Sequence, residues 1–393
     1  MSNSLKILLL AIVTFFVGTS EYVIAGFLDI IAKDTGISVA SAGQLISIFS
    51  LSYAIGTPIL VALTARMDRR TLFIASLVTF VIGNAMVNFL PGYLPLLLSR
   101  VVLALSAGIF LTVAITMATK LAKPEKIGSA ISTVVMGFST SFVIGIPLGR
   151  LVAANMNWKL NFAALGILGF VAIFILMAAI PRTEGETPIP LVKQLAFLKN
   201  PKILMALVVI FFWILGYSIA FTYITPFLLN VANMSTSTIS IALFIFGLAS
   251  MIGAKIGGSA TDKWGVRKTL LSGLILHAIS LALLALSAHS IVAVLFVLVL
   301  WSLSLWSSGP TQQVNLVSQA PEASSIMISL YSSTHQLSMA IGVGLGGLVL
   351  KNMPISSVVW FGALGVTIAA ILAIRAIRPV VKVANMLPIH ENK

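Results

Sequence analysis

One carboxylic acid lies inside the first long apolar stretch of the chain. Residues 5–31 are mostly hydrophobic, and at about 1.5 Å per helical residue they can cross a hydrocarbon core of roughly 30 Å. Glu21 lies past the middle of this stretch, where an ionised carboxylate is costly unless it is paired, hydrated or protonated. An acid at such a depth is a candidate proton or ion site. The alternative is an ion pair that only stabilises the fold.

A second charged residue, Arg100, lies in the fourth apolar stretch, residues 94–118. Glu21 is about 15 Å and Arg100 about 9 Å below the outer ends of their helices, so they differ in depth by roughly one helical turn. A guanidinium side chain is long enough to close that difference. We therefore expect Arg100 to hold Glu21 ionised in one conformation, and a rearrangement or substrate entry to let Glu21 take a proton. A permanent structural pair is the alternative.

Aromatic and amide side chains within the apolar stretches are candidates for binding a substrate. A largely neutral cavity lined by such groups suits a flat, neutral, hydrogen-bonding molecule better than a strong ion. Alternatively, the Tyr and Trp residues only anchor the protein at the membrane interface, and the histidine is a neutral packing residue. Trp301 and Trp306 are five residues apart, so they cannot both face one cavity. The candidates are Tyr22, Gln44, Tyr217, Tyr223, Trp301, Gln312 and His335.

The composition indicates which class of protein holds these side chains. The chain has 393 residues, of which 59% are hydrophobic and 9% charged, and its mean hydropathy is +1.10. Soluble domains carry about 25% charged residues, so the chain is predicted to be an integral membrane protein. The sequence has no cysteine, no P-loop and no His-Glu-x-x-His motif. We therefore expect no enzyme activity, cofactor or metal ion, and energy from an ion gradient or the substrate's own gradient.

Apolar stretches of 20 residues or more recur along the chain with short polar breaks between them. In lipid the backbone must satisfy its own hydrogen bonds, so each stretch is predicted to be a helix. The predicted fold class is all-α integral membrane, with twelve spans in two halves of six. The spans are residues 5–31, 40–64, 71–91, 94–118, 127–152, 160–180, 203–230, 236–261, 268–288, 290–313, 326–350 and 355–377.

The distribution of Lys and Arg predicts how the helices are oriented. With both termini in the cytoplasm, the inner segments carry eighteen of these residues, and the outer loops carry only Lys33, Lys159 and Lys351. Positive residues are retained on the cytoplasmic side, so we expect both termini there. The net charge of +14 then reflects orientation, and no nucleic-acid partner is expected. We expect a monomer in the inner membrane of a bacterium.

The two halves of the chain repeat at a constant offset of 197 residues. The glycine-containing segment 145–149 falls on segment 342–346, and Arg70 falls on Arg267. Two six-helix repeats with a site at their interface are an architecture of membrane transporters. The longest polar break separates the repeats. The predicted domains are residues 1–180, a cytoplasmic linker 181–202, and residues 203–393.

Three other polar residues in the spans are expected to have structural roles. Lys255 is expected to extend its ammonium group toward the cytoplasmic side, and the alternative is a contact with a substrate anion. His277 is expected to pack at the periphery of the protein. Asp29, at the outer end of the first span, is expected to be interfacial and not a second proton site.

The segment that follows the eighth span resembles the cytoplasmic loop motif of the major facilitator superfamily. It reads Gly258-Ser-Ala-Thr-Asp262-Lys-Trp-Gly265-Val-Arg267, and the resemblance extends over essentially the whole chain. In that family the loop ties neighbouring helices together, and Asp262 is expected to meet a helix N-terminus. In the first-half copy Ala65 replaces the acid and Asp68 replaces the glycine, and whether Asp68 substitutes for the acid is open. The motif residues are Arg66, Asp68, Arg69, Arg70, Gly258, Asp262, Gly265 and Arg267.

The fifth span is similar to the antiporter motif of twelve-span drug:proton exporters. The matching residues are Gly145, Pro147 and Gly149, while Ile146 and Arg150 depart from the pattern. Glycine and proline let helices approach closely and bend the backbone, although packing glycines are also common in membrane helices. The resemblance implies that this segment seals the outward end of the transporter against leak.

Two further segments are similar to members of the same drug:proton antiporter family. Ser99-Arg100 is similar to the arginine motif of proton-coupled members. Gly18-Thr-Ser-Glu21-Tyr22 is similar to exporters of chloramphenicol, of purine bases and nucleosides, and of arabinose-type sugars, and the tenth span is most similar to the purine exporters. The resemblance also implies that the first and fourth spans are neighbours.

These features predict a proton-coupled secondary transporter that works by alternating access. It would export a drug, a purine base or nucleoside, or a sugar-like molecule, with drug resistance as one outcome. Its partners would be that substrate, protons carried by Glu21 and Arg100, and membrane lipid. Two alternatives remain open. One is a facilitative or uptake carrier without proton coupling, and the other is a non-transporting membrane receptor or scaffold.

Overall fold

Helices make up the regular structure of the chain. The computed structural model describes residues 2–64, 66–123, 127–181, 196–287, 289–320 and 323–376. The first half contains α1 (Asn3–Gly26), α2 (Leu28–Thr35), α3 (Val39–Leu63), α4 (Arg69–Phe89), α5 (Tyr93–Leu121), α6 (Ile127–Thr140), the π-helix η2 (Ser141–Gly145), α7 (Ile146–Asn155) and α8 (Lys159–Ala179). The second half contains the short 3-10 helix η3 (Phe197–Lys199), α10 (Pro201–Phe221), α11 (Ile224–Asn230), α12 (Thr236–Leu286), α13 (Ile291–Val317), α14 (Ser324–Asn352) and α15 (Ser357–Ala376). Most of the predicted linker lies outside the described residues, so the domain boundaries remain a prediction.

Each predicted span corresponds to a described helix, to consecutive helices or, for the eighth and ninth spans, to one part of a helix. Among the described residues, ten helices are long and apolar enough to cross a membrane. One of them, α12, supplies two spans, because Gly265 interrupts it with a left-handed backbone conformation (φ 79°, ψ 165°) that favours glycine. The helix α14 occupies the place of the eleventh span. The prediction of an all-α membrane protein is confirmed.

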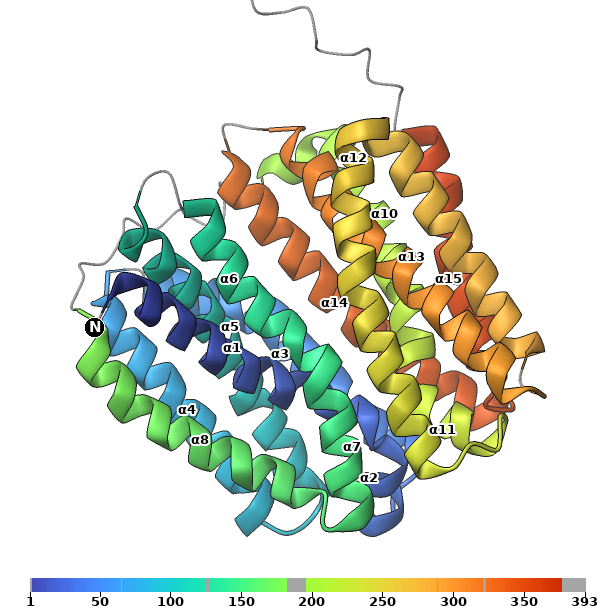
Figure 1. Cartoon of the computed structure of the whole chain (residues 1–393), viewed down its shortest axis with the longest axis horizontal. Helices are drawn as coiled ribbons and strands as arrows, with labels where there is room; N and C mark the ends of the chain where they lie inside the picture. Colours follow the sequence, from blue (N-terminus) through green and yellow to red (C-terminus); the bar gives the residue numbers. More distant parts are fainter. Residues whose placement is uncertain are drawn as a thin grey trace, which may run out of the picture.

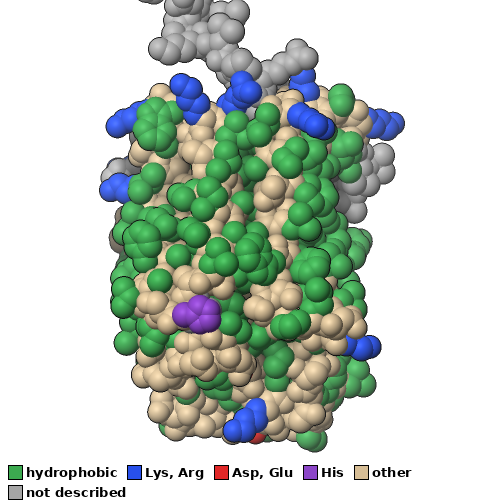
Figure 2. All heavy atoms as spheres, turned by 90° about the vertical axis from the view of Figure 1, so that its right-hand side faces the viewer, with side chains coloured by type: hydrophobic (Ala, Val, Ile, Leu, Met, Phe, Trp, Pro, Cys, Tyr) green, Lys and Arg blue, Asp and Glu red, His purple; other side chains and the backbone are tan. Residues whose placement is uncertain are grey.

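A hydrophobic surface surrounds the helices. On the face shown in Figure 2, hydrophobic side chains dominate the middle, and Lys and Arg side chains gather along the upper edge. Ile82, Ile167 and Ile252 are each more than half exposed. A continuous apolar surface of this kind is a liability in water but contacts hydrocarbon in a membrane. The chain is therefore a multi-pass membrane protein.

The two halves interrupt their first spans at equivalent positions. After Phe27, α1 continues as α2, and after Tyr223, α10 continues as α11. The offset of 197 places Phe27 on residue 224, which is the first residue of α11. Glycines at this offset also pack alike, because Gly145 lies against α1 and Gly342 lies against α10. The described helices therefore follow the predicted repeat.

Helices α1 to α8 form an N-terminal bundle, and α10 to α15 form a C-terminal bundle (Figure 1). The surface along which the bundles face each other is called the seam. Across it, α3 packs against α14, and η2 and α7 pack against α12. At one end of the seam α2 also contacts α11, and this end is called the closed end. In Figure 1 the bundles lie together at this end, near the bottom of the view, and diverge toward the opposite end.

Candidate functional site

Glu21 lies in the seam between the two bundles. It belongs to α1, and its side chain is 3% exposed. Its Oε1 accepts a hydrogen bond of 3.0 Å from Nε2 of Gln336, which belongs to α14 in the opposite bundle. Its other oxygen, Oε2, has no hydrogen-bond partner among the described residues. The acid is thus held across the seam at one oxygen and can accept a proton or a ligand at the other.

Arg100 binds the backbone beside Glu21 and not its carboxylate. The guanidinium donates to the backbone carbonyl oxygens of Ser20 at 2.8 Å, of Glu21 at 3.0 Å and of Leu45 at 3.2 Å. Its Cζ lies 4.4 Å from the centroid of the Phe49 ring. The ion pair predicted from the sequence is not formed in this conformation, because these carbonyls take the donors of Arg100. The residue instead ties α5 to α1 and α3 at the depth of the acid.

Aromatic rings from both bundles line the seam beside the acid. Between ring centroids, Phe142 of η2 lies 4.2 Å from Tyr22 and 5.0 Å from Trp306. Phe142 also lies 6.2 Å from Phe221, which stacks on Tyr217 at 5.0 Å. Such rings offer apolar faces to a flat molecule. The structure therefore brings Tyr22 and Tyr217 together, and their contact with a substrate stays a prediction.

Four buried polar atoms of this region have no hydrogen-bond partner among the described residues. They are Glu21 Oε2, Gln336 Oε1, the Tyr217 hydroxyl and Trp306 Nε1. Buried polar groups are nearly always paired, and an unpaired one costs about 1–3 kcal/mol. The first two atoms are acceptors, Trp306 Nε1 is a donor, and the hydroxyl can be either. We define the seam site as Glu21, Tyr22, Phe142, Tyr217, Phe221, Trp306 and Gln336.

The seam site has the chemistry to bind protons and polar molecules through its side chains. No group of three or more His, Asp or Glu side chains that could hold a metal ion occurs among the residues described. The structure thus offers a proton or hydrogen-bonding site, and the described part of the chain provides no metal centre.

Trp301 lies inside the C-terminal bundle and not in the seam. It is fully buried, and its indole N–H donates to Nε2 of His277 at 2.8 Å. Phe246 packs on it at 5.2 Å between ring centroids. Trp306 is five residues further along α13 and lies on a different face of the helix. It contacts Phe142 across the seam. Between ring centroids, Trp301 lies 6.4 Å from Tyr217 and 6.2 Å from Phe221, so it packs directly behind two rings of the seam site. Its contact with a substrate stays a prediction, and His277 is its packing partner in the core of the bundle.

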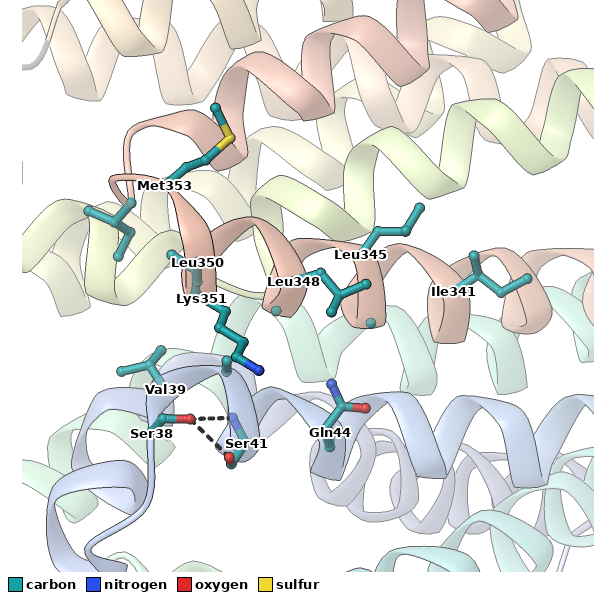
Figure 3. A pocket seen from close by; sticks show the side chains of 14 residues that line it. Ser38, Val39, Ser41, Gln44, Ile341, Leu345, Leu348, Leu350, Lys351 and Met353 are labelled. Carbon is teal, nitrogen blue, oxygen red and sulfur yellow. Dashed lines mark hydrogen bonds between the residues drawn. The ribbon is translucent and has the colours of Figure 1, made fainter.

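Tyr223 and Gln44 lie at the closed end of the seam. Tyr223 is fully buried, and its hydroxyl donates to the carbonyl oxygen of Val343 at 3.0 Å. A Cβ built on Gly43 of α3 would meet the same hydroxyl at 2.3 Å. Gln44 lines a pocket of about 960 Å³ between α3 and α14, opposite Lys351 (Figure 3). Both predicted contacts thus lie where α3 and α14 close the seam, outside the seam site.

His335 and Gln312 differ in their access to the seam. His335 is half-buried on α14, directly before Gln336, and its ring centroid lies 6.1 Å from that of Tyr331. Gln312 on α13 is fully buried, and neither Nε2 nor Oε1 of its amide has a partner among the described residues. Substrate contact stays a prediction for both residues.

The segment that resembles the antiporter motif follows a π-helix. In η2 the N–H of Ile146 bonds to the carbonyl of Ser141, five residues back. Pro147 has no N–H and cannot continue the α-helical pattern at this position. The irregular turn places Phe142 in the seam, where it contacts rings of both bundles.

The two glycines of this segment allow close contact with α1. A Cβ built on Gly145 would meet Oγ1 of Thr19 at 2.5 Å, and one built on Gly149 would meet Cγ2 of Val23 at 2.1 Å. Both distances are shorter than real Cβ contacts, so a larger residue would force the helices apart. Their role in sealing the transporter stays a prediction.

Arg150, a departure from the family pattern, forms a buried ion pair with Asp29. The distances are 2.6 Å between Nη1 and Oδ1 and 3.1 Å between Nη2 and Oδ2. Nη1 also donates to the carbonyl of Gly26 at 2.9 Å. Arg150 is 1% exposed and Asp29 14%. Asp29 is therefore not simply interfacial, because it fastens α2 to α7 in the N-terminal bundle.

Asp68 caps a helix in the first-half loop. Its Oδ1 accepts hydrogen bonds from the backbone N–H of Thr71 at 2.8 Å and from the Thr71 hydroxyl at 3.0 Å. This satisfies the N-terminus of α4. Arg69 is buried in the first turn of α4, and Arg70 donates to the carbonyl of Met177 in α8. Asp68 thus caps the helix that it precedes, and this local contact does not test whether it substitutes for the acid that is missing at position 65.

The second-half loop is built differently. Gly265 turns the chain within α12, and Asp262 is exposed three residues before it. Among the described residues no hydrogen bond joins Asp262 to a helix N-terminus, and that contact stays a prediction. A Cβ on Gly258 would meet nothing within 4 Å, and Arg267 is half-buried. Lys255 is exposed on α12, as a lysine with its ammonium extended toward water would be.

Three residues of the seam site, Gln336, Phe142 and Phe221, were not identified from the sequence. Gln336 ends the polar segment 332–336 within an apolar span, and this polarity was the available signal. Phe142 lies three residues before Gly145, but nothing in the sequence distinguishes it from a phenylalanine that faces lipid. For Trp306 the sequence offered one constraint: Trp301 and Trp306 are five residues apart on a helix, so only one of the two could face a given cavity.

The family profile of the Major Facilitator Superfamily matches residues 10–342 and 233–387 of the chain. The chain is 49% identical over 374 residues to the uncharacterized MFS-type transporter YbcL of Bacillus subtilis (strain 168), covering 95% of this chain and 96% of that protein. It is 26% identical over 379 residues to the inner membrane transport protein YdhP of Escherichia coli (strain K12), covering 96% and 97% respectively.

Solved structures share the fold. Two crystal structures of a bacterial homolog to the human lysosomal transporter Spinster, both inward-facing, cover 95% of this chain and 96% of their own. The unoccupied conformation gives a TM-score of 0.78 at 18% identity, and the occupied conformation gives 0.80 at 17%. At this identity the likeness concerns the arrangement of the helices.

Proposed function

Because the chain belongs to the major facilitator superfamily, whose members are non-enzymatic carriers, we propose that it exports a small organic molecule in exchange for protons. Family membership makes the protein a membrane transporter that works by alternating access. The proposal adds the proton, the direction of transport and the kind of substrate. It also places the protein, as a monomer, in the bacterial cytoplasmic membrane.

The buried carboxylate of Glu21 is the observation that carries the proposal. Its Oε1 bonds to Gln336, and its Oε2 has no partner among the described residues. The free energy of a buried ionised carboxylate depends strongly on its partners, so a rearrangement that changes them also changes proton binding. Because Gln336 belongs to the other bundle, relative movement of the bundles would change those partners.

The distribution of charge supports an orientation with both termini in the cytoplasm. Arg70 in the first turn of α4, Lys120 in the last turn of α5 and Arg267 after the Gly265 break of α12 are remote from the closed end. Lys33 and Lys351 lie at the closed end. By the positive-inside rule the closed end then faces outward. Export is further supported by the glycines and proline of residues 145–149, which resemble an antiporter motif.

The seam site suits a flat and neutral substrate. Rings of both bundles offer apolar faces, and the unpaired polar atoms offer hydrogen bonds at their edges. Arg100 is the nearby cation, but its donors are taken by backbone carbonyls. Its positive charge acts on Glu21, so the two charges balance and a neutral substrate is favoured over an anion. Nucleobases, nucleosides, sugars and neutral drugs are the classes to test.

The test is internal pH in proteoliposomes that contain a pH-sensitive dye, with these classes added in turn. We expect one class to evoke proton flux with the native protein and none with Glu21→Gln. The amide oxygen at position 21 can still accept the N–H of Gln336, but the side chain cannot carry a proton. Asp34→Asn is the matched control, because Asp34 accepts from the Trp158 indole at 2.8 Å and an amide oxygen preserves that bond.

The alternative function is a carrier that is not coupled to protons. It predicts flux of a labelled substrate without proton movement, and equal transport by the native protein and Glu21→Gln. That result would assign Glu21 a structural role and refute the proposed exchange. Substrate binding without flux would instead indicate a receptor.

A further inference from the structure

We propose that Gln336 couples the substrate to the proton: its amide holds ionised Glu21 across the seam, and the substrate releases it with an N–H donor of its own. This inference rests on the proposed exchange and deepens it. It assigns a role to a residue of the C-terminal bundle and a chemical class to the substrate.

The bond between Glu21 and Gln336 differs from other hydrogen bonds across the seam. Ser47 donates to the carbonyl of Ala340 at 2.6 Å, and Thr225 donates to the carbonyl of Ala25 at 3.1 Å. Those acceptors are backbone carbonyls, whose charge does not change with pH. Glu21 is a titratable acceptor, so the strength of its bond to Gln336 depends on whether it holds a proton.

The sign of this dependence follows from the geometry. An N–H donor binds an ionised oxygen about twice as strongly as a neutral one. Ionised Glu21 therefore holds α1 against α14 in the described conformation. A proton on Glu21 weakens this connection and frees the bundles to move.

Among the groups around Glu21, Gln336 is the one that can hold the ionised carboxylate across the seam. The charged group nearby is Arg100 on α5, whose three nitrogens each donate to a backbone carbonyl and not to the carboxylate. The titratable groups within electrostatic range are the phenols of Tyr22 on α1, Tyr53 on α3 and Tyr217 on α10, which are uncharged at neutral pH. On α14 itself, His335 precedes Gln336 and lies about 100° around the helix. Of these groups, the Tyr22 hydroxyl also interacts with the Glu21 carboxylate. Tyr22 lies next to Glu21 on α1, however, so Gln336 is the described donor that reaches the acid from the other bundle.

The unpaired oxygens of Glu21 and Gln336 determine which groups the substrate must carry. Oε2 of Glu21 and Oε1 of Gln336 both accept hydrogen bonds and have no described partner. A substrate that engages them must donate, through N–H or O–H groups along its edge. The Trp306 indole and the Tyr217 hydroxyl can then pair with acceptors on the same molecule. The class is a flat neutral ring with N–H donors beside carbonyl or ring-nitrogen acceptors.

The arrangement prevents futile cycling. A carrier with ionised Glu21 and no substrate keeps the bond to Gln336, so it does not change conformation. It changes conformation only after the substrate has replaced the amide or after a proton has neutralised the acid. These two permitted steps are the ones an obligatory exchange requires.

The first experiment measures proton leak in proteoliposomes without any substrate, under an imposed pH gradient. We expect the native protein to be tight and Gln336→Leu to leak about tenfold faster or more, since bonds to charged groups contribute at least this factor. The double variant Glu21→Gln/Gln336→Leu should be tight again, because it carries no proton. Gln336→Asn, which keeps the amide on a shorter side chain, should leak less than Gln336→Leu.

Gln319→Leu, two residues after the end of α13, is the matched control and should stay tight. A purely structural Gln336 would reduce protein yield or all transport without creating a leak. A tight Gln336→Leu variant with native-like coupled exchange would overturn the inference while leaving the proposed exchange intact. If the native protein showed no coupling between substrate and proton flux, both the proposed exchange and the role of Gln336 would be refuted.

The second experiment tests the donor. Xanthine and uracil carry ring N–H groups, while caffeine and 1,3-dimethyluracil are their methylated forms without any N–H. We expect the compounds that evoke proton flux to carry such donors, and the methylated forms to evoke none. Flux evoked by caffeine or 1,3-dimethyluracil would contradict the assigned substrate class.

Discussion

The contact between Gly43 and Tyr223 should control whether the closed end can stay closed. A Cβ on Gly43 would meet the Tyr223 hydroxyl at 2.3 Å and its ring carbons at 2.9 and 3.0 Å. Tyr223 cannot turn aside freely, because it is fully buried and bonded to Val343. Overpacking of this kind costs about 1–3 kcal/mol. The cost applies only while the bundles touch here, so Gly43→Ala should shift the equilibrium toward opening of this end by about 5- to 150-fold.

The chain contains no cysteine, so a labelled pair can be introduced without other changes. Lys33 on α2 and Asn230 on α11 are both exposed at the closed end. Spin labels attached to Lys33→Cys and Asn230→Cys would report the distance across this end by pulsed electron paramagnetic resonance. In Gly43→Ala we expect a larger population at long distance, with unchanged protein yield.

Gly344→Ala provides the matched control on the facing helix. A Cβ there would find its nearest neighbour, Oγ of Ser47, at 4.0 Å. This variant should leave the distance distribution as it is. The reasoning fails if Gly43→Ala also leaves the distribution unchanged, or if both glycine variants change it equally.

Two further substitutions test other contacts of the N-terminal bundle. Asp29→Ala leaves buried Arg150 without its carboxylate and should reduce stability by about 3 kcal/mol; thermal unfolding in detergent should show a lower midpoint, restored in large part by adding Arg150→Leu. A midpoint equal to that of the native protein would mean that the ion pair contributes nothing. Gly145→Leu should abolish exchange in proteoliposomes at normal protein yield, because even a Cβ would meet Thr19 at 2.5 Å; full exchange activity would argue against a close contact during the cycle.

The fold could be predicted from the sequence because two of its causes are local. Apolar stretches of sufficient length must be helices in lipid, and their number and order can be counted. The repeat offset also predicted that the halves would be alike, as the equivalent interruptions after Phe27 and Tyr223 illustrate. Glu21 could be found for a related reason, because the depth of an acid follows from its position in a span.

The partners of the charged residues could not be predicted, because they depend on which helix faces meet. Gln336 is 315 residues away from Glu21 in sequence, and only the packing of the bundles brings them together. The pairing of Arg100 with the Glu21 carboxylate was predicted from depth and from the implied contact of the first and fourth spans, whereas the structure directs the guanidinium to backbone carbonyls. Depth fixes a residue along a helix axis but not around it.

The position of the acids has an electrical consequence for the proposed exchange. Glu21 is the one acid in the middle of a predicted span, and the other nine lie at span ends or outside the spans. If this acid carries one proton inward for each neutral molecule that leaves, every cycle moves one positive charge across the membrane. Voltage then contributes about 2.3 kcal/mol per 100 mV, as much as roughly 1.7 units of pH difference. Such a carrier would keep exporting in a cell whose internal and external pH are equal, driven by membrane potential alone.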